Sequence, residues 1–362
     1  MSSLTPTQKK HQQALKSYKH ISPNLSLFER LYLNSFWNYV ATFYSVRIAP
    51  NVLTLAGFLC STLAFLLVLT FGTSKAPLLT SFLLFAYQTL DGTDGKHARN
   101  TRSGSPIGEV VDHGVDAIVT SWYVYIVLDL FPSFSSPTMC FLFLTCSQVA
   151  FVTSQLTLLH LGKQFMGEFD SQESQVLIQC LLVLRSFGLD GFLFGSHTST
   201  PILFGLSLMD LFGWCIVLNL FRALFESTYA IYAHYLTSNR RSNGETMRSF
   251  QYQLGLLLFF VFLSWMCRER LEFMQWFFLS AFSIADISNH VLVCRIVKEP
   301  TPWFHSGLVV MMFAVLIGKD NGVIAGWIFP LIMACLHLRY VVPRCVLFAK
   351  LLGVNVLTVV KK

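Results

Sequence analysis

The stretch QTLDGTDGKHARNTRSGSPIGEVVDHGVD, residues 88–116, holds four aspartates and one glutamate. The apolar run 77–91 leads into it and the apolar run 107–131 leads out of it. Charged groups close to a bilayer are costly and are rarely kept without a use. The stretch therefore predicts a polar site held between two helices of a membrane protein.

The composition of the whole chain supports that class. Of the 362 residues 54% are hydrophobic and only 12% are charged, whereas soluble domains carry about 25% charged residues. We predict an all-α polytopic membrane protein, because helices satisfy their own backbone hydrogen bonds in lipid. About ten transmembrane helices are expected, at roughly 52–72, 77–91, 107–131, 138–161, 175–196, 202–226, 251–268, 271–294, 305–318 and 322–342.

The segments outside these runs indicate how the chain meets the membrane. Residues 25–43 place leucines and aromatic residues at helical three-and-four spacing, which predicts an amphipathic helix lying in the interface. The net charge of +7 comes from Lys and Arg that sit mostly in short loops, a pattern that favours anionic lipid over nucleic acid. Their distribution predicts that both termini and the stretch 88–116 face the cytosol.

Three regions follow from this organisation. Residues 1–50 are expected to form a cytosolic tail and the interfacial amphipathic helix. Residues 51–236 are expected to form a block of six transmembrane helices that contains the acidic stretch. Residues 250–362 would add four transmembrane helices and a short cytosolic tail, with the polar segment 237–249 as the boundary.

The four aspartates of the opening stretch form two pairs, and we call them the aspartate cluster: Asp91, Asp94, Asp112 and Asp116. The members of the first pair are three residues apart and those of the second are four apart, so each pair shares one face of a helix. The connection between the two helices is short enough to bring the two faces together.

Four carboxylates at close quarters repel one another unless cations sit among them. Hard oxygen ligands select Mg²⁺ or Mn²⁺, and two such ions would balance the four charges. Two divalent ions on a shared carboxylate set are typical of displacement at phosphorus. Gly92, Gly95 and Ala98 would leave room for a bulky phosphate ester, and Arg99 would meet its oxygens. Helix caps, or the ion pathway of a transporter or channel with a metal-binding carboxylate cluster, are the alternatives.

The pattern D-x2-D-G-x2-A-R-x8-G-x3-D-x3-D resembles the defining motif of the CDP-alcohol phosphotransferase family. It is carried by Asp91, Asp94, Gly95, Ala98, Arg99, Gly108, Asp112 and Asp116. LFAYQTLDGTDGKHAR (84–99), PIGEVVDHGVD (106–116) and IADISNHVLVCRI (284–296) are further similar to segments of the eukaryotic choline/ethanolamine phosphotransferases.

The resemblance implies a reaction. The hydroxyl of a diacylglycerol or alkyl-acylglycerol attacks the β-phosphorus of CDP-ethanolamine or CDP-choline and gives the phospholipid and CMP. It also implies dependence on Mg²⁺ or Mn²⁺, two ions held by the aspartate cluster, and a homodimer in the endoplasmic reticulum or Golgi membrane with its active site facing the cytosol. Gly92 lies where ethanolamine-type members carry glycine, which favours ethanolamine.

Roles for individual residues follow from the same resemblance. Gly95, Ala98, Arg99 and Gly114 would seat the CDP group, with a contribution from Asn51 at the start of the first span.

A lipid hydroxyl needs a base, and His113, one turn before Asp116, is the candidate. In the alternative interpretation His113 donates a hydrogen bond to a metal-bound aspartate, and Asp116 is then the next candidate for the base.

Neighbouring residues carry further expectations. Glu109 either orients His113 and the substrate amine or is a first-turn glutamate favoured by the helix dipole. His97 is expected to be solvated. Asp170 and Glu173 are expected to form a capping box at the start of the fifth span.

The aromatic residues of the third span, Trp122, Tyr123 and Tyr125, could cage an ammonium group, but we favour packing against lipid.

Overall fold

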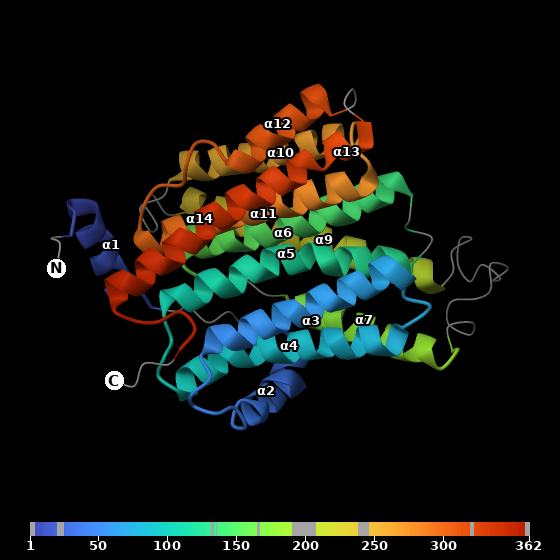
Figure 1. Ribbon diagram of the computed structural model, residues 1–362, viewed down its shortest axis with the longest axis horizontal. Helices are drawn as coiled ribbons and strands as arrows, with labels where there is room; N and C mark the ends of the chain where they lie inside the picture. The colour runs from blue at the N-terminus through green and yellow to red at the C-terminus, as the bar shows by residue number, and fades with distance from the viewer. Residues whose placement is uncertain are drawn as a thin grey trace.

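Long helices lie side by side in a computed structural model of the chain (Figure 1). The structure describes residues 4–19, 25–131, 134, 136–164, 167–189, 208–237, 246–318 and 322–358. Among these residues the regular elements are helices, and the extended backbone contributes one isolated bridge, between Ile48 and Thr358. The predicted all-α architecture is therefore confirmed.

The elements follow one another along the chain with these bounds: α1 (Pro6–Lys16), η1 (Glu29–Leu33), α2 (Asn34–Val40), α3 (Pro50–Phe71), α4 (Pro77–Asn100), α5 (Pro106–Leu130), α6 (Pro137–Leu161), α7 (Ser171–Ser186), α9 (Leu208–Thr237), α10 (Met247–Arg268), α11 (Phe273–Val297), α12 (Ser306–Ile317), α13 (Gly322–Gly326) and α14 (Ile328–Leu352).

Each of the ten predicted apolar segments overlaps a helix in the described residues, and the last one is divided between α13 and α14. Five described stretches are long and apolar enough to cross a membrane, namely α3, α6, α10, α11 and Ile324–Leu352, and α12 is a shorter apolar helix. The chain is thus a polytopic membrane protein. Parts of two predicted segments, 190–196 and 202–207, lie outside the described residues, as do residues 238–245 of the predicted boundary.

Three helices run well past the ends that the apolar pattern predicted. α4 continues from the apolar run to Asn100, α9 continues past the predicted end at 226 to Thr237, and α14 continues past the predicted end at 342 to Leu352. A helix needs no apolar side chains once it leaves the bilayer, because its backbone hydrogen bonds are internal. The extension matters for function, since the polar part of α4 carries Asp91 and Asp94.

Helix starts in this chain follow local chemistry. Pro50, Pro77, Pro106 and Pro137 each occupy the first turn of a helix, where the missing N–H costs no hydrogen bond. The predicted capping box of α7 is confirmed: the Asp170 amide donates to Glu173 Oε2 at 2.9 Å, and the Asp170 side chain caps the helix in return.

α11 lies at the centre of the bundle, with α5 and α6 on one side and α12 and α14 on the other (Figure 1). In its most apolar window 83% of the residues are buried within the protein, compared with 39% for α3. Aromatic stacking joins α11 to the N-terminal half of the chain, because Phe277 stacks on Phe65, at 5.8 Å between ring centroids, and on Trp122, at 6.0 Å. A helix from the C-terminal half therefore packs directly on α5, which carries Asp112 and Asp116.

The predicted interfacial segment forms η1 and α2 and packs beside α4 (Figure 1). Leu31, Tyr32 and Tyr39 are exposed along it, as an apolar face turned toward lipid requires. Trp37 points the other way and is buried. The Phe28 amide donates to Glu173 Oε1 at 2.8 Å, which ties the segment to α7.

The N-terminal tail contains a helix that the polar sequence did not lead us to expect. α1 starts with a capping box between Thr5 and Gln8 and buries Leu15 against the ends of α5, α11 and α14. Its Gln12 donates to the Leu351 carbonyl at 2.8 Å. Figure 1 shows α1, the C-terminal end of α14 and the connection from α4 to α5 at the same end of the bundle.

Candidate active site

The aspartate cluster sits at that end, on two helices that α3 holds together. α3 packs against both α4 and α5. α4 ends at Asn100, and α5 restarts after a short turn with Ser105 as its N-cap and Pro106 in its first turn. The turn reverses the chain, so the last turns of α4 face the first turns of α5.

The four aspartates come together as the spacing predicted. The carboxyl groups of Asp91 and Asp94 on α4 lie near those of Asp112 and Asp116 on α5. Asp112, His113 and Asp116 each offer a ligand atom, and these atoms lie within 4.8 Å of one another. Asp112 Oδ1 is buried and has no hydrogen-bond partner among the described residues. Crowded oxygen donors with an orphaned buried atom fit a hard divalent cation.

Two neighbours that the sequence did not reveal hold the outer sides of the cluster. The Thr54 hydroxyl of α3 donates to Asp94 Oδ2, and the Tyr87 hydroxyl donates to Asp116 Oδ1 at 2.8 Å. Partners of this kind orient carboxylates that bind metals. Spacing offered a signal for Tyr87, which lies one turn before Asp91 on α4, but no local pattern pointed from Thr54 to α4.

His113 lies between two carboxyl groups of its own helix. Its Nδ1 is 3.7 Å from Asp116 Oδ2 and its Nε2 is 3.9 Å from Glu109 Oε1. Its side chain is 17% exposed, so the ring remains reachable from outside. The imidazole therefore borders the aspartate cluster and has room to exchange a proton.

Glu109 forms an ion pair that neither of its two predicted roles included. It is buried, and Oε1 accepts a hydrogen bond from the Arg295 guanidinium of α11. The partners are 186 residues apart, and each keeps one buried atom, Glu109 Oε2 and Arg295 Nε, without a partner in the described part of the chain. The pair fastens the first turn of α5 to the last turn of α11, next to His113.

The five residues predicted to seat CDP divide into three groups. Gly95, Ala98 and Arg99 lie on the polar end of α4, where Gly95 and Arg99 are exposed. Gly114 faces α11, and a Cβ there would meet Asn289 Oδ1 at 3.1 Å. Asn51 is buried and donates to the Val356 carbonyl of the C-terminal segment at 2.7 Å.

Three expectations from the sequence are wrong. His97 is 1% exposed instead of solvated, and its Nε2 lies 2.9 Å from the Ile48 carbonyl oxygen. Trp122 and Tyr123 are buried in the protein core rather than turned to lipid. Gly92 does not leave space for substrate, because a Cβ there would lie 2.4 Å from the Trp37 ring. In each case a contact from a distant segment decides the environment.

Comparison with known proteins places this geometry in a family. The sequence model of the CDP-alcohol phosphatidyltransferases matches residues 47–185, which run from just before α3 almost to the end of α7. The choline/ethanolaminephosphotransferase 1 of Saccharomyces cerevisiae is 29% identical over 337 residues, 85% of this chain and 83% of that protein. The ethanolaminephosphotransferase 1 of Mus musculus is 26% identical over 336 residues, 83% of this chain and 80% of that protein.

Residues 47–185 therefore form a domain that matches the CDP-alcohol phosphatidyltransferase family.

A third relative, the uncharacterized CDP-alcohol phosphatidyltransferase class-I family protein 2 of Dictyostelium discoideum, is 32% identical over 194 residues. That match covers 51% of this chain and about half, 47%, of the relative. The region matched by the family model contains the aspartate cluster and His113. Arg295 and Asn289, which contact this CDP-alcohol phosphatidyltransferase site from α11, lie beyond it.

Proposed function

We propose that this protein transfers phosphoethanolamine or phosphocholine from CDP-ethanolamine or CDP-choline to a diradylglycerol, the last step of phospholipid synthesis from CDP-alcohols. The glycerol oxygen forms a new bond to the β-phosphorus, the bond from that phosphorus to CMP breaks, and the hydroxyl proton leaves to a base. The products are phosphatidylethanolamine or phosphatidylcholine, or their ether-linked counterparts, and CMP. The observation that supports this best is the meeting of four carboxyl groups and His113 at one end of α4 and α5.

In this proposal the aspartate cluster would hold two Mg²⁺ or Mn²⁺ ions. Bound there, divalent ions neutralise the charge of the diphosphate and of the departing CMP. Thr54 and Tyr87 hold Asp94 and Asp116 in place, so their remaining oxygens are fixed in direction before substrate arrives. Orientation fixed in advance lowers the barrier, because less rearrangement is needed when the charge develops.

His113 would accept the proton of the lipid hydroxyl. A neutral imidazole has a free nitrogen for this purpose, and Asp116 and Glu109 on either side would stabilise the ring once it is charged. Arg295 offsets the charge of Glu109, so His113 does not face two free carboxylates. If His113 instead donates to a metal-bound carboxylate, Asp116 is the next candidate for the base.

The CDP group would lie along the polar end of α4. Gly95 is exposed, and Nη1 of Arg99 is 3.7 Å from the position of a Cβ on Gly95, so the guanidinium lies over the glycine. An arginine above a bare backbone suits a phosphate group. Ala98, Gly114 and Asn51 would complete the seat, with Gly114 acting by admitting Asn289 of α11.

We further propose the cellular setting and assembly. The protein would reside in the endoplasmic reticulum or Golgi membrane as a homodimer with the active site facing the cytosol. Residues 51–236 would form the catalytic block, and the helices of 250–362 would support it through α11.

The test is phospholipid formation by the purified protein with diacylglycerol, Mg²⁺ and radiolabelled CDP-ethanolamine or CDP-choline. Wild type is run beside His113→Ala and beside the surface control Glu226→Gln, whose carboxylate pairs with Arg222 on α9. We expect product from wild type and the control only. If neither CDP-alcohol gives product with either divalent ion, and the protein conducts ions across sealed vesicles, the proposal is wrong and the transporter interpretation is favoured.

A further inference from the structure

A second group of metal-binding side chains lies on α11 and at the start of α12, away from the α4–α5 face. We call Asp286, His290 and His305 the histidine cluster. One ligand atom from each lies within 4.8 Å of the other two. Asp286 and His290 lie in the segment IADISNHVLVCRI (284–296), and His305 follows 15 residues after His290.

Two of the three residues, Asp286 and His305, are buried and carry a polar atom without a hydrogen-bond partner in the described residues. Asp286 is 0% exposed, and its Oδ2 accepts a hydrogen bond from the Ser306 hydroxyl at 2.8 Å, whereas Oδ1 has no hydrogen-bond partner in the described residues. His305 is 3% exposed and its Nδ1 also lacks a partner there. Leaving a carboxylate oxygen and an imidazole nitrogen buried and unpaired is costly, so a shared ligand would remove both penalties.

His290 is held in the form that a metal requires. Its Nδ1 donates to the Asp286 backbone carbonyl at 2.8 Å and lies 3.6 Å from Asp286 Oδ1, so the lone pair of the ring is left on Nε2. Metal-binding histidines commonly donate their other ring N–H to a backbone carbonyl in this way. Its ring also stacks on Tyr340 of α14, with 3.5 Å between centroids.

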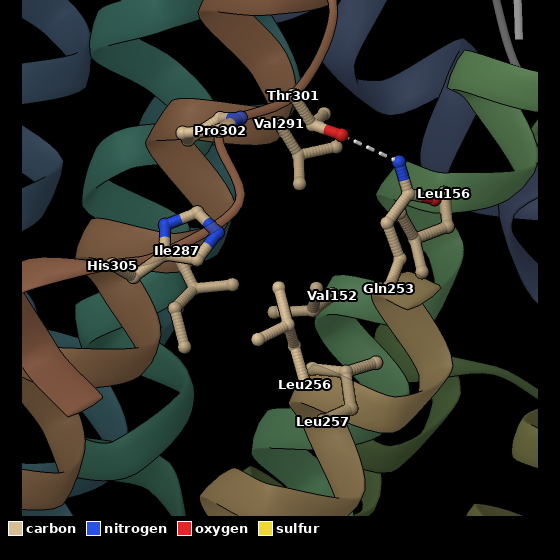
Figure 2. Close-up of a pocket in the computed structure, with 10 residues that line it drawn as sticks. All are labelled: Val152, Leu156, Gln253, Leu256, Leu257, Ile287, Val291, Thr301, Pro302 and His305. Carbon is tan, nitrogen blue, oxygen red and sulfur yellow. Dashed lines mark hydrogen bonds between the residues drawn. The ribbon is translucent and has the colours of Figure 1, made fainter. Parts of the chain in front are cut away.

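The residues around the histidine cluster include one nearby cation, and a cavity borders the cluster. Arg344 stacks on Tyr340 as well, with its guanidinium carbon 3.5 Å from the ring centroid, so the ring separates it from His290. His305 borders the cavity of Figure 2, whose other walls are mainly apolar. Apart from His305, the polar side chains on those walls, Gln253 and Thr301, bond to each other at 2.9 Å. Neither of these side chains is a hydrogen-bond partner of His305 Nδ1.

The geometry points to a structural zinc site formed by Asp286, His290 and His305. Two imidazoles and a carboxylate are ligands that Zn²⁺ accepts in a tetrahedral site, which leaves one position for a further ligand. His337 of α14 is the candidate for that position, because it is 5% exposed, its Nδ1 has no partner among the described residues, and it lies near Asp286 and His290. The ion would fasten α12 and α14 to α11.

The experiment measures zinc itself and needs no transfer activity. Purified full-length protein in detergent is stripped with chelator, loaded with one equivalent of Zn²⁺, passed through a desalting column and analysed by mass spectrometry of metals. We expect one zinc per chain in wild type and in Asp112→Asn. His305→Gln and Asp286→Asn should lose it, whereas Cys335→Ser, which removes an exposed thiol, should keep it.

Cobalt gives a second measurement that does not depend on the folding of any variant. In wild type loaded with Co²⁺ we expect the visible absorption of a tetrahedral ion without the near-ultraviolet band of a thiolate ligand. An octahedral cobalt spectrum, a thiolate band, or zinc content unchanged in a folded His305→Gln protein would each overturn the proposal. The result is independent of whether the protein transfers a phospholipid head group.

Discussion

The aspartate cluster and the histidine cluster are two groups of possible metal ligands in one helical bundle, and they differ in exposure and in chemistry. In the aspartate cluster, Asp116 is 22% exposed, and all four members offer carboxylate oxygens. Asp286 of the second is fully buried, and two of its three members offer nitrogen. Open oxygen ligands suit ions that exchange with substrate, and enclosed nitrogen ligands suit an ion that stays. In our proposals, burial and donor type separate a site for chemistry from a site for structural support.

Among the tests of this comparison, removal of divalent ions should have the largest effect on the transfer rate. After dialysis against chelator we expect complete loss of phospholipid formation, because the aspartates would repel the diphosphate without cations. Mg²⁺ or Mn²⁺ should restore the rate, and Zn²⁺ should not. The measurement is the transfer rate against each ion, with bound zinc determined in the same samples. If the rate instead follows the zinc content, the histidine cluster also takes part in transfer and the two clusters do not have separate roles.

Asp112→Asn should come next. The change removes one charge from the centre of the aspartate cluster. The transition state should lose several kcal/mol of stabilisation, so kcat should fall by about 10³-fold or more. Glu226→Gln is the matched control, since it removes an acid from an exposed pair and should keep the wild-type rate. A normal kcat in Asp112→Asn would contradict the proposal that the aspartate cluster takes part in the reaction.

His113→Ala should lower kcat by about 10²-fold, the contribution of a general base. In wild type the rate should fall at low pH, where the imidazole is protonated and has no free lone pair. In the variant this limb of the pH profile should disappear while the Mg²⁺ requirement stays the same. A variant that keeps the limb but needs more Mg²⁺ would assign His113 to holding an aspartate.

Arg295→Met tests the contact between the two halves of the molecule. Glu109 would be left buried and unpaired, so the free energy of unfolding should drop by about 3 kcal/mol and kcat by about 10-fold. Glu109→Gln combined with Arg295→Met should recover most of the stability, because the buried charge is then gone. Thermal unfolding of the two single variants and the double variant measures this, and simple addition of the two losses would refute the pairing.

Tyr87→Phe should have the smallest effect. It removes one hydrogen bond to Asp116 and keeps the ring, which costs about 1 kcal/mol, or about fivefold in rate. We expect the loss as a higher Mg²⁺ concentration for half-maximal rate. An unchanged Mg²⁺ dependence would mean that Asp116 needs no positioning.

Local patterns predicted much of this protein. The apolar segments each became a helix, and the spacing of the aspartates placed them on facing sides of α4 and α5. The capping box at Asp170 and Glu173 was likewise predictable, since it involves residues three apart. The wrong expectations, for His97, Trp122 and Gly92, concern side chains whose surroundings come from other parts of the chain.

The sequence by itself determined the long apolar helices and the gathering of carboxylates on α4 and α5. A helix in lipid has no alternative way to satisfy its backbone, and residues three or four apart on a helix must share a face. Only the tertiary structure decided that Arg295 pairs with Glu109, that Asn289 lies against Gly114 and that His305 meets Asp286. Such contacts depend on which helices lie side by side and in which rotation, and those are fixed by packing of the whole bundle rather than by local spacing.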